Sequence, residues 1–262
     1  MIGRHQNAAS IGIRGFTLVE AIITIVLTGI LVAAVAVFVS VPVKGYLDVS
    51  RRADLTDIAD SALRRIGRDL RGALPNSVQI TGGGAQIQFI PIKAAGRYRE
   101  GAPGNPLDFA DAADTSFDVI GPGVNIAAGD FLVIYNLGIT GSDAYAGNNR
   151  RTATSIGAAV TAVTFSGAQF PFASPARRFQ VVGTPASYVC SGGLLTRYWN
   201  YAYGVTPPAG SSALLASNVS ACQFAYATGI TAQNALVTLQ LGITRDNETV
   251  SLVHQVHVSN VP

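Results

Sequence analysis

The chain has 262 residues, of which 13% are charged, and its formal net charge is +3 at pH 7. Two of the positive charges, Arg4 and Arg14, lie within the first fifteen residues, which leaves about +1 for the rest. This small net charge gives no support for a basic surface that binds nucleic acid. We therefore expect no nucleic-acid partner. The length is sufficient for one core of ordinary size.

Residues 1–15 show no periodic apolar pattern and are predicted to be a leader peptide that is removed. Basic residues that flank an apolar segment remain on the cytoplasmic side of a membrane. Arg4 and Arg14 therefore predict a cytoplasmic N-terminus, with the bulk of the chain exported.

The next segment, residues 16–43, is predicted to span a membrane. Its central run, Ala21 to Val39, contains no charged residue, and about 20 apolar residues in a helix cross the hydrocarbon core of a bilayer. Glu20 is the exception, because an ionised carboxylate at the edge of hydrocarbon costs on the order of several kcal/mol unless a cation pairs with it. No Lys or Arg lies between Glu20 and Lys44. The partner of Glu20 must come from elsewhere.

Two other interpretations of this N-terminus remain open. One is a simple membrane anchor with a glutamate at the membrane edge. The other is a secretory signal peptide cleaved after Ala36, because residues 34–36 form a small-x-small site. The apolar run continues past Ala36 to Val39, and Glu20 is misplaced in such a signal, so both features count against the second interpretation.

Residues 44–74 are predicted to be the amphipathic half of the same helix, which ends because Pro75 cannot continue it. Apolar residues recur at intervals of three and four and form one stripe able to pack on a sheet. The stripe consists of Leu55, Ala59, Ala62, Leu63, Ile66 and Leu70. Charges at i,i+4 spacing are expected to pair on the solvated face, Asp48 with Arg52, Asp60 with Arg64, and Arg65 with Asp69.

Residues 75–262 are predicted to form a β-rich globular domain, because glycine is frequent and Thr, Ser and Val are prominent there. The polar segment 93–116 is predicted to be a long loop. The last two strands are predicted to form a hairpin through 244–248, with Val237, Leu239 and Leu241 on one face. The predicted strands are residues 77–80, 86–92, 131–136, 160–165, 179–182, 188–190, 194–203, 221–226, 236–243 and 249–258.

The predicted fold class is therefore α+β. A long N-terminal helix, first transmembrane and then amphipathic, precedes an antiparallel β-rich globular domain. The two cysteines, Cys190 and Cys222, belong to the exported domain, where an oxidising compartment allows a disulfide. Closing a loop of about 33 residues would stabilise the fold by about 3 to 4 kcal/mol. Two unpaired buried thiols are the alternative.

The chain offers little for catalysis or metal binding. His254 and His257 are three residues apart, which places them on opposite faces of a strand. No nucleophile elbow, P-loop, dinucleotide fingerprint or Cys-x-x-Cys pair occurs. A solvated acidic loop is favoured over a calcium site for a group that lacks the spacing and glycine of an EF-hand, namely Asp108, Asp111, Asp114 and Asp118. We expect no enzymatic activity, no metal and no cofactor.

Three aromatic residues, Trp199, Tyr201 and Tyr203, alternate along the predicted strand 194–203. Such a row could form an exposed platform that stacks on a sugar or on another subunit, although aromatic alternation is more often sheet packing. The platform motivates an alternative function, a membrane-anchored exported carbohydrate-binding domain.

The string Gly-Phe-Thr-Leu-Val-Glu at residues 15–20, followed by the apolar run, resembles the cleavage site of type IV pilins and related pseudopilins. The resemblance implies that a prepilin peptidase cuts between Gly15 and Phe16 and methylates the new amine of Phe16. It also implies that Glu20 of one subunit neutralises the Phe16 amine of its neighbour during assembly, which makes burial of both charges tolerable.

The resemblance also implies the partners and the location. The partners are the prepilin peptidase, other major and minor pilin subunits, the inner membrane and the pilus assembly platform. The chain would cross the inner membrane once, with its C-terminal domain in the periplasm, and would enter the pilus after assembly.

Two further resemblances concern the type of subunit. Residues 62–77 look like the junction between helix and sheet in minor pilins and in J-type minor pseudopilins of type II secretion. Four strings are similar to the O-type minor pilins of the mannose-sensitive haemagglutinin (MSHA) pilus system, at residues 187–190, 195–199, 222–224 and 254–262. They imply a minor pilin that primes or joins filament assembly, with the pseudopilin as alternative. Residues 93–178 match neither.

Overall fold

The computed structural model describes residues 15–228 and 234–262, without the side chains of residues 40–44 and 228. The chain divides into two compact units, one up to Arg51 and one from Arg52 to Pro262. One helix, α1 (Leu18–Arg71), contributes to both units, and every described strand belongs to the second. The predicted leader, residues 1–15, lies outside the described residues apart from Gly15. An apolar helix followed by antiparallel strands confirms the predicted α+β class.

In the first unit, α1 carries no charged residue between Ala21 and Val39. Its segment Leu18–Val39 is long and apolar enough to cross a membrane. The large side chains of this segment are exposed, up to 82% for Phe38. A helix that is hydrophobic all round belongs in a membrane or in a protein core. This segment therefore requires cover that its own unit does not supply.

In the second unit, α1 packs through one face only. All six residues of the predicted apolar stripe, from Leu55 to Leu70, are buried in one core. The core is completed by side chains such as Ile87 and Tyr188 from one sheet and Leu239 from another. Burying a leucine or isoleucine stabilises a fold by about 1.5 to 3 kcal/mol, so the stripe is a main attachment between helix and sheets. The six residues of the predicted stripe thus pack on the sheets, as their spacing indicates.

Two antiparallel sheets cover this face of the helix. The five-stranded sheet has the order β1-β2-β11-β12-β13, and the three-stranded sheet has the order β14-β15-β16. The strand bounds are β1 (Gln79–Thr81), β2 (Gln86–Phe89), β11 (Ala186–Ser191), β12 (Leu194–Trp199), β13 (Ser211–Ala216), β14 (Val219–Thr228), β15 (Asn234–Arg245) and β16 (Glu248–Ser259). A 3-10 turn, η1 (Gly82–Gly84), joins β1 to β2.

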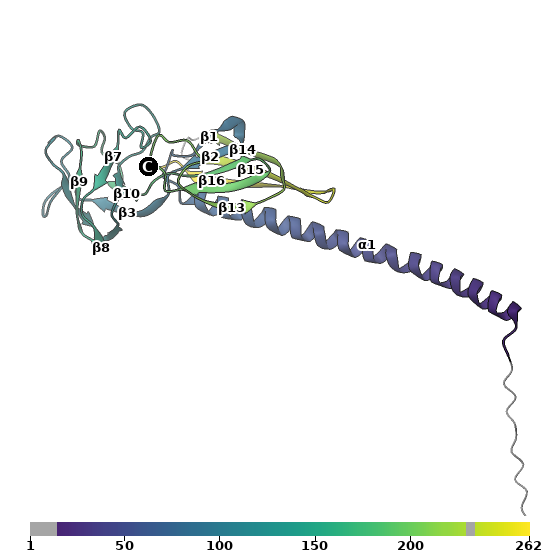
Figure 1. The fold of residues 1–262 in the computed structure, drawn as a ribbon. Coiled ribbons are helices and arrows are strands. Elements are labelled where there is room, and N and C mark those ends of the chain that lie inside the picture. The colour runs from purple at the N-terminus through teal and green to yellow at the C-terminus, as the bar shows by residue number, and fades with distance from the viewer. Residues whose placement is uncertain (1–14, 229–233) are drawn as a thin grey trace, which may run out of the picture. The chain divides into compact units, whose positions relative to one another are not determined.

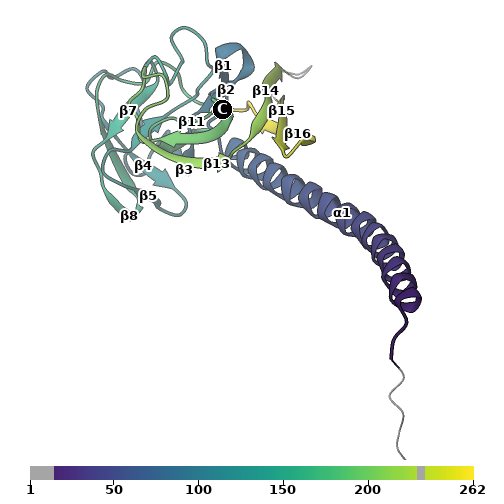
Figure 2. The same cartoon turned by 45° about the vertical axis from the view of Figure 1, so that its right-hand side comes forward.

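Between β2 and β11 the chain forms a closed barrel with the strand order β10-β3-β4-β9-β7-β6. The barrel has its own core, which includes Phe117, Phe179 and Leu132. In Figures 1 and 2 its strands group together, apart from β14, β15 and β16. The bounds are β3 (Ile92–Tyr98), β4 (Ser116–Ile120), β6 (Phe131–Val133), β7 (Arg150–Ala153), β9 (Ala162–Ser166) and β10 (Arg178–Val182), with β5 (Val124–Ile126) and β8 (Gly157–Val160) as a separate pair.

The predicted long loop at residues 93–116 is wrong in its first part, because β3 occupies Ile92–Tyr98. Gly96 explains the error. A glycine in a polar segment suggests a turn, but here the Phe179 ring lies over Gly96, and a Cβ at residue 96 would meet that ring at 2.7 Å. Glycine in a strand often marks such a close approach. The loop itself is the shorter stretch 99–115.

The hairpin of β15 and β16 is tighter than predicted. Arg245 pairs with Glu248, and the two residues between them, Asp246 and Asn247, have φ of 52° and 64°. A two-residue turn with both φ positive matches the right-handed twist of the strands. Val237, Leu239 and Leu241 are buried on one face as predicted.

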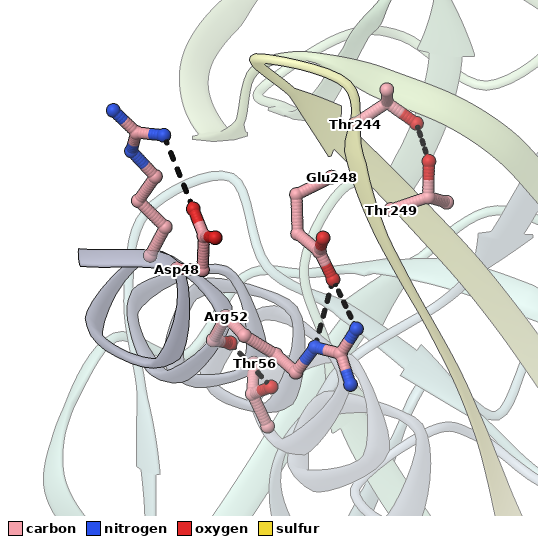
Figure 3. Close-up of polar contacts among 7 residues, drawn as sticks. Asp48, Arg52, Thr56, Thr244, Glu248 and Thr249 are labelled. Carbon is pink, nitrogen blue, oxygen red and sulfur yellow. Dashed lines mark hydrogen bonds and ion pairs between the residues drawn. The ribbon is translucent and has the colours of Figure 1, made fainter. Parts of the chain in front are cut away.

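The charges of the helix pair differently from the i,i+4 prediction. Asp60 and Arg64 do form an ion pair, but Asp48 pairs with Arg51 instead of Arg52. Figure 3 shows the Arg52 guanidinium reaching Glu248 at the start of β16, with the Arg52 Nε donating to Glu248 Oε1 at 2.7 Å. An extended arginine can satisfy a carboxylate far away in sequence as readily as one on its own helix.

Asp69, the predicted partner of Arg65, faces the five-stranded sheet instead. Its Oδ2 accepts hydrogen bonds from the Tyr188 hydroxyl at 2.7 Å and from the Arg197 Nε at 3.0 Å. Burial, followed by the bond to Asp69, raises the pKa of Tyr188. The predicted solvated face is therefore interrupted at Asp69, which fastens the end of the helix to β11 and β12.

Candidate functional site

The bond between Gly15 and Phe16 lies before the first turn of α1. Residues 15–17 have no regular secondary structure, and Phe16 is 73% exposed. A Cβ built on Gly15 would meet no described atom within 4 Å. Exposed chain outside regular structure is where proteases cut most readily. The predicted cleavage position is therefore open to an enzyme.

Thr17 caps the helix, a role that the sequence analysis missed. The Glu20 N–H donates to Thr17 Oγ1 at 3.2 Å, and the Ala21 N–H donates to the Thr17 carbonyl at 3.1 Å. A threonine three residues before a glutamate is the pattern of a capping box. That spacing was visible in the sequence and could have placed the start of the helix at Leu18.

Glu20 lies in the first turn of α1 and is exposed. A carboxylate at this position is stabilised by the partial positive charge of the helix N-terminus, by about 0.3 to 1 kcal/mol in water. Its carboxylate has neither a hydrogen-bond partner nor an ion-pair partner among the described residues. The capping contact uses the Glu20 backbone only. In the described part of the chain the charged group is therefore unpaired.

The surface after Glu20 is continuous and apolar. Ile22, Ile25 and Leu27 are each more than half exposed. A Cβ on Gly29 would meet nothing within 4 Å, so the helix surface is low at that point. An exposed apolar surface of this extent marks a contact with a membrane or with another protein. Glu20 is thus a single charge at the border of a surface that must leave water.

The two cysteines lie on different sheets. Cys190 in β11 and Cys222 in β14 form a disulfide, with a Cα–Cα distance of 6.3 Å. Their strands belong to the five-stranded and the three-stranded sheet, respectively. The bond therefore fastens together the two sheets that enclose the second half of α1.

The acidic loop uses its carboxylates on its own backbone. Asp108 and Asp111 each accept a hydrogen bond from the backbone N–H two residues on, and Asp114 accepts from Asp108 and Ser116. In the described part of the chain no three His, Cys, Asp or Glu side chains gather as a metal site would require. His254 and His257 have opposite orientations, since His254 is half-buried beside Gly67 and His257 is exposed.

The predicted aromatic row does not form. β12 ends at Trp199, Asn200 has a φ of 58°, and Tyr201 is 4% exposed. Tyr203 donates to the Gly183 carbonyl at 2.7 Å. The turn at Asn200 breaks the alternation on which the platform depended, so the structure gives no support to a sugar-stacking surface made of these three side chains.

Comparison with known proteins gives one match, and it covers the N-terminal segment. The family model for the prokaryotic N-terminal methylation motif matches residues 12–36. The match contains the Gly15–Phe16 bond, Thr17, Glu20 and the first part of the apolar helix. Searches of curated proteins and of solved structures gave no significant match to the chain. The N-terminus of this protein is a type IV pilin-like prepilin signal, which implies a substrate of a prepilin peptidase with pilus-type partners.

Proposed function

We propose that the protein is a minor pilin of an MSHA-like type IV pilus, which primes or joins filament assembly through its N-terminal helix. The observation that carries the proposal is the Glu20 carboxylate, unpaired among the described residues, at the start of an exposed apolar helix and inside the matched methylation motif. The role is structural, so no catalytic residue is assigned.

The proposed processing and topology follow from the same segment. Residues 1–15 are removed as a leader, and Phe16 becomes the methylated N-terminus. Residues 16–43 span the inner membrane with the N-terminus in the cytoplasm, and residues 44–74 form the amphipathic half of the helix. Residues 75–262 lie in the periplasm as the β-rich domain and reach the pilus on assembly.

The proposed assembly step is a charge pairing. Cleavage leaves an ammonium group on Phe16, and this group and Glu20 both have to leave water when the apolar helices of neighbouring subunits pack. An unpaired buried charge is strongly unfavourable, whereas a close ion pair removes most of that cost. Glu20 of one subunit and Phe16 of its neighbour therefore select helix packing in a defined register.

The MSHA-like identity is supported by strings that fall on the core-forming strands β11, β12, β14 and β16. A J-type minor pseudopilin of type II secretion would use the same N-terminal chemistry. The neighbouring genes distinguish the two subunits. Genes for adhesion-pilus components would favour the minor pilin, and genes for a secretion channel would favour the pseudopilin.

The deciding experiment is the N-terminal mass of the protein isolated from its native host. We expect a chain that begins at Phe16 and carries one methyl group. A chain that begins after Ala36 would lack Glu20 and most of the apolar helix, and that result would overturn the proposal in favour of a secreted domain. An unprocessed chain that begins at Met1 would point to a simple anchor.

A further inference from the structure

Most basic residues of the barrel lie on or beside two neighbouring strands. Residues 92–182 contain seven basic and seven acidic residues, so the segment has no net charge. Arg150 and Arg151 donate to backbone carbonyls and lie over aromatic rings. Lys93 pairs with the buried Asp130. Four arginines remain, and all of them lie on or beside β3 and β10: Arg97, Arg99, Arg177 and Arg178.

Arg97 and Arg178 lie directly across from each other on neighbouring strands. β3 and β10 are antiparallel, and Arg178 is the register partner of Arg97. Both side chains are exposed on the outside of the barrel, and neither guanidinium has an ion pair or hydrogen bond within the described residues. Like charges opposite each other destabilise a sheet. The pair is therefore a local cost to the barrel unless an anion binds there.

A hollow adjoins this pair. Arg99, Glu100, Ile120 and Arg177 line it, together with Gly101 and Ala102. Ile120 is the register partner of Arg97 on β4 and is 41% exposed. Arg177 pairs with Glu100 at 2.5 Å.

The Arg99 Nε is buried without a hydrogen bond. Its nearest carboxylate, Asp118, is 3.8 Å away, which is beyond hydrogen-bond reach. A buried donor without a partner is unfavourable, because it has lost its hydrogen bond to water without replacement. Arg99, which carries this unsatisfied donor, lines the hollow, and the two unpaired guanidiniums belong to residues next to it in the sheet. The carboxylates that pair with arginines here are Glu100, with Arg177, and Asp118, with Arg99.

We propose that this face of the barrel, Arg97, Arg99, Arg177 and Arg178, binds the oxyanion groups of an acidic polysaccharide. The planar guanidinium forms paired hydrogen bonds to a carboxylate or a sulfate, and two adjacent ones fit successive anionic groups of a polymer. The binding does not depend on the chain's assembling into a filament.

The composition of the hollow argues against two other polyanions. Single-stranded nucleic acids bind with their bases stacked on aromatic side chains, and no aromatic side chain lines this hollow. Protein partners are anchored by buried aromatic and large apolar groups, and Ile120 is the one large apolar residue here. A sugar polymer recognised through its charged groups needs neither.

The test is binding of the purified full chain, in detergent, to immobilised polysaccharides. Heparin supplies sulfates, polygalacturonate supplies carboxylates, and dextran is the neutral control. We expect saturable binding to at least one of the two acidic polymers, no binding to dextran, and weaker binding at higher salt because the contacts are ionic. The polymer that the chain binds more tightly shows whether sulfate or carboxylate is the preferred group.

The double variant Arg97→Gln, Arg178→Gln should bind about tenfold or more weakly, because it removes two charge-assisted contacts. The matched control is Arg65→Gln, Arg68→Gln, which removes the same charge from two exposed helix residues whose guanidiniums have no partner among the described residues, and it should change affinity less than about twofold. If the glutamine variant fails to fold, as judged by Trp199 fluorescence, Arg97→Lys, Arg178→Lys keeps the charge and should still bind several-fold more weakly.

Three outcomes would overturn the proposal. Equal losses in the test and control variants would mean attraction by overall charge. Tighter binding to polyglutamate than to either polysaccharide would assign the face to an acidic protein. Absence of binding to both polymers at low salt would leave the arginines without an anionic polysaccharide ligand.

Discussion

Between Ile22 and Val39 the large apolar side chains of α1 are exposed, whereas between Leu55 and Leu70 a single apolar stripe is buried. Both segments are helical, so local propensity does not distinguish them. The difference is the source of the cover. The second segment is covered by sheets of its own chain, whereas the first has no cover among the described residues and requires lipid or another protein. The proposed pairing of Glu20 belongs to the border of this first segment.

The largest expected effect comes from the charge at the border of the first segment. Glu20→Gln keeps the shape of the side chain and removes its charge, so the Phe16 amine of the neighbouring subunit would be buried unpaired. Losing one partner of a buried ion pair costs about 3 to 5 kcal/mol, which corresponds to a loss of at least about a hundredfold in subunit incorporation. Immunoblots of sheared pili and of membranes should show lost incorporation with retained insertion.

Thr17→Val is the matched control for that variant. It removes the capping hydroxyl, at a cost of about 1 kcal/mol to the helix end, and leaves the Glu20 charge intact. Incorporation close to that of the parent chain would separate the charge from the cap. If Thr17→Val abolished incorporation and Glu20→Gln did not, helix capping would explain the motif and the charge-pairing step would be wrong.

One leucine-to-alanine substitution in each segment tests whether the chain's own sheets bury that segment. Leu63→Ala, at a position that is 2% exposed, should lower the free energy of unfolding by about 3 kcal/mol. Leu27→Ala, at a position that is 55% exposed, should change it by less than about 0.5 kcal/mol. Urea denaturation in detergent, followed through the single tryptophan, Trp199, reports on the second unit. Equal effects would contradict the division of the helix into two environments.

High pH should weaken the second unit through its partly buried phenol, Tyr203. Burial raises the pKa of Tyr203 from 10.0 to about 12, and Arg150 partly opposes the shift. The folded state therefore holds the phenol proton more tightly than the unfolded state does. This contribution is complete below pH 10 and is lost as pH rises from 10 towards 12. Urea midpoints of the parent chain should fall over this window, and Tyr203→Phe should fall less steeply.

The smallest expected effect is at the exposed ion pair of Arg52 and Glu248. The Arg52 side chain is 69% exposed, and such pairs contribute at most about 1 kcal/mol because solvent screens them. Arg52→Gln should therefore lower the free energy of unfolding by about 0.5 kcal/mol or less. Arg65→Gln, which removes an exposed charge without a described partner, serves as the baseline. A loss above 2 kcal/mol would show that this contact holds the hairpin in place.

Much of the helix and of the last sheet could be predicted because their signals are local. The spacing of three and four between Leu55 and Leu70 depends on the helical period alone, and the alternation of Val237, Leu239 and Leu241 depends on the period of a strand. The candidate site is similarly local, since Gly15, Phe16 and Glu20 lie within six residues. Thr17 belonged to the same local pattern and was overlooked.

The barrel was missed because its pattern is made by contacts between distant residues. From the sequence, Gly96 is expected in a loop, but it lies in a strand because the Phe179 ring packs over it. Asp69 is expected to be solvated, but it accepts hydrogen bonds from Tyr188 and Arg197. Tyr201 reads as part of a strand until the left-handed Asn200 turns the chain.

The sequence by itself determined the prepilin signal, the apolar helix with its one carboxylate, and the amphipathic stripe, because each depends on the order of neighbouring residues. Only the tertiary structure decided that residues 92–182 close into a barrel and that Arg97 and Arg178 lie side by side. Strand pairing joins residues some eighty positions apart, and no short-range period in the chain encodes which strands meet.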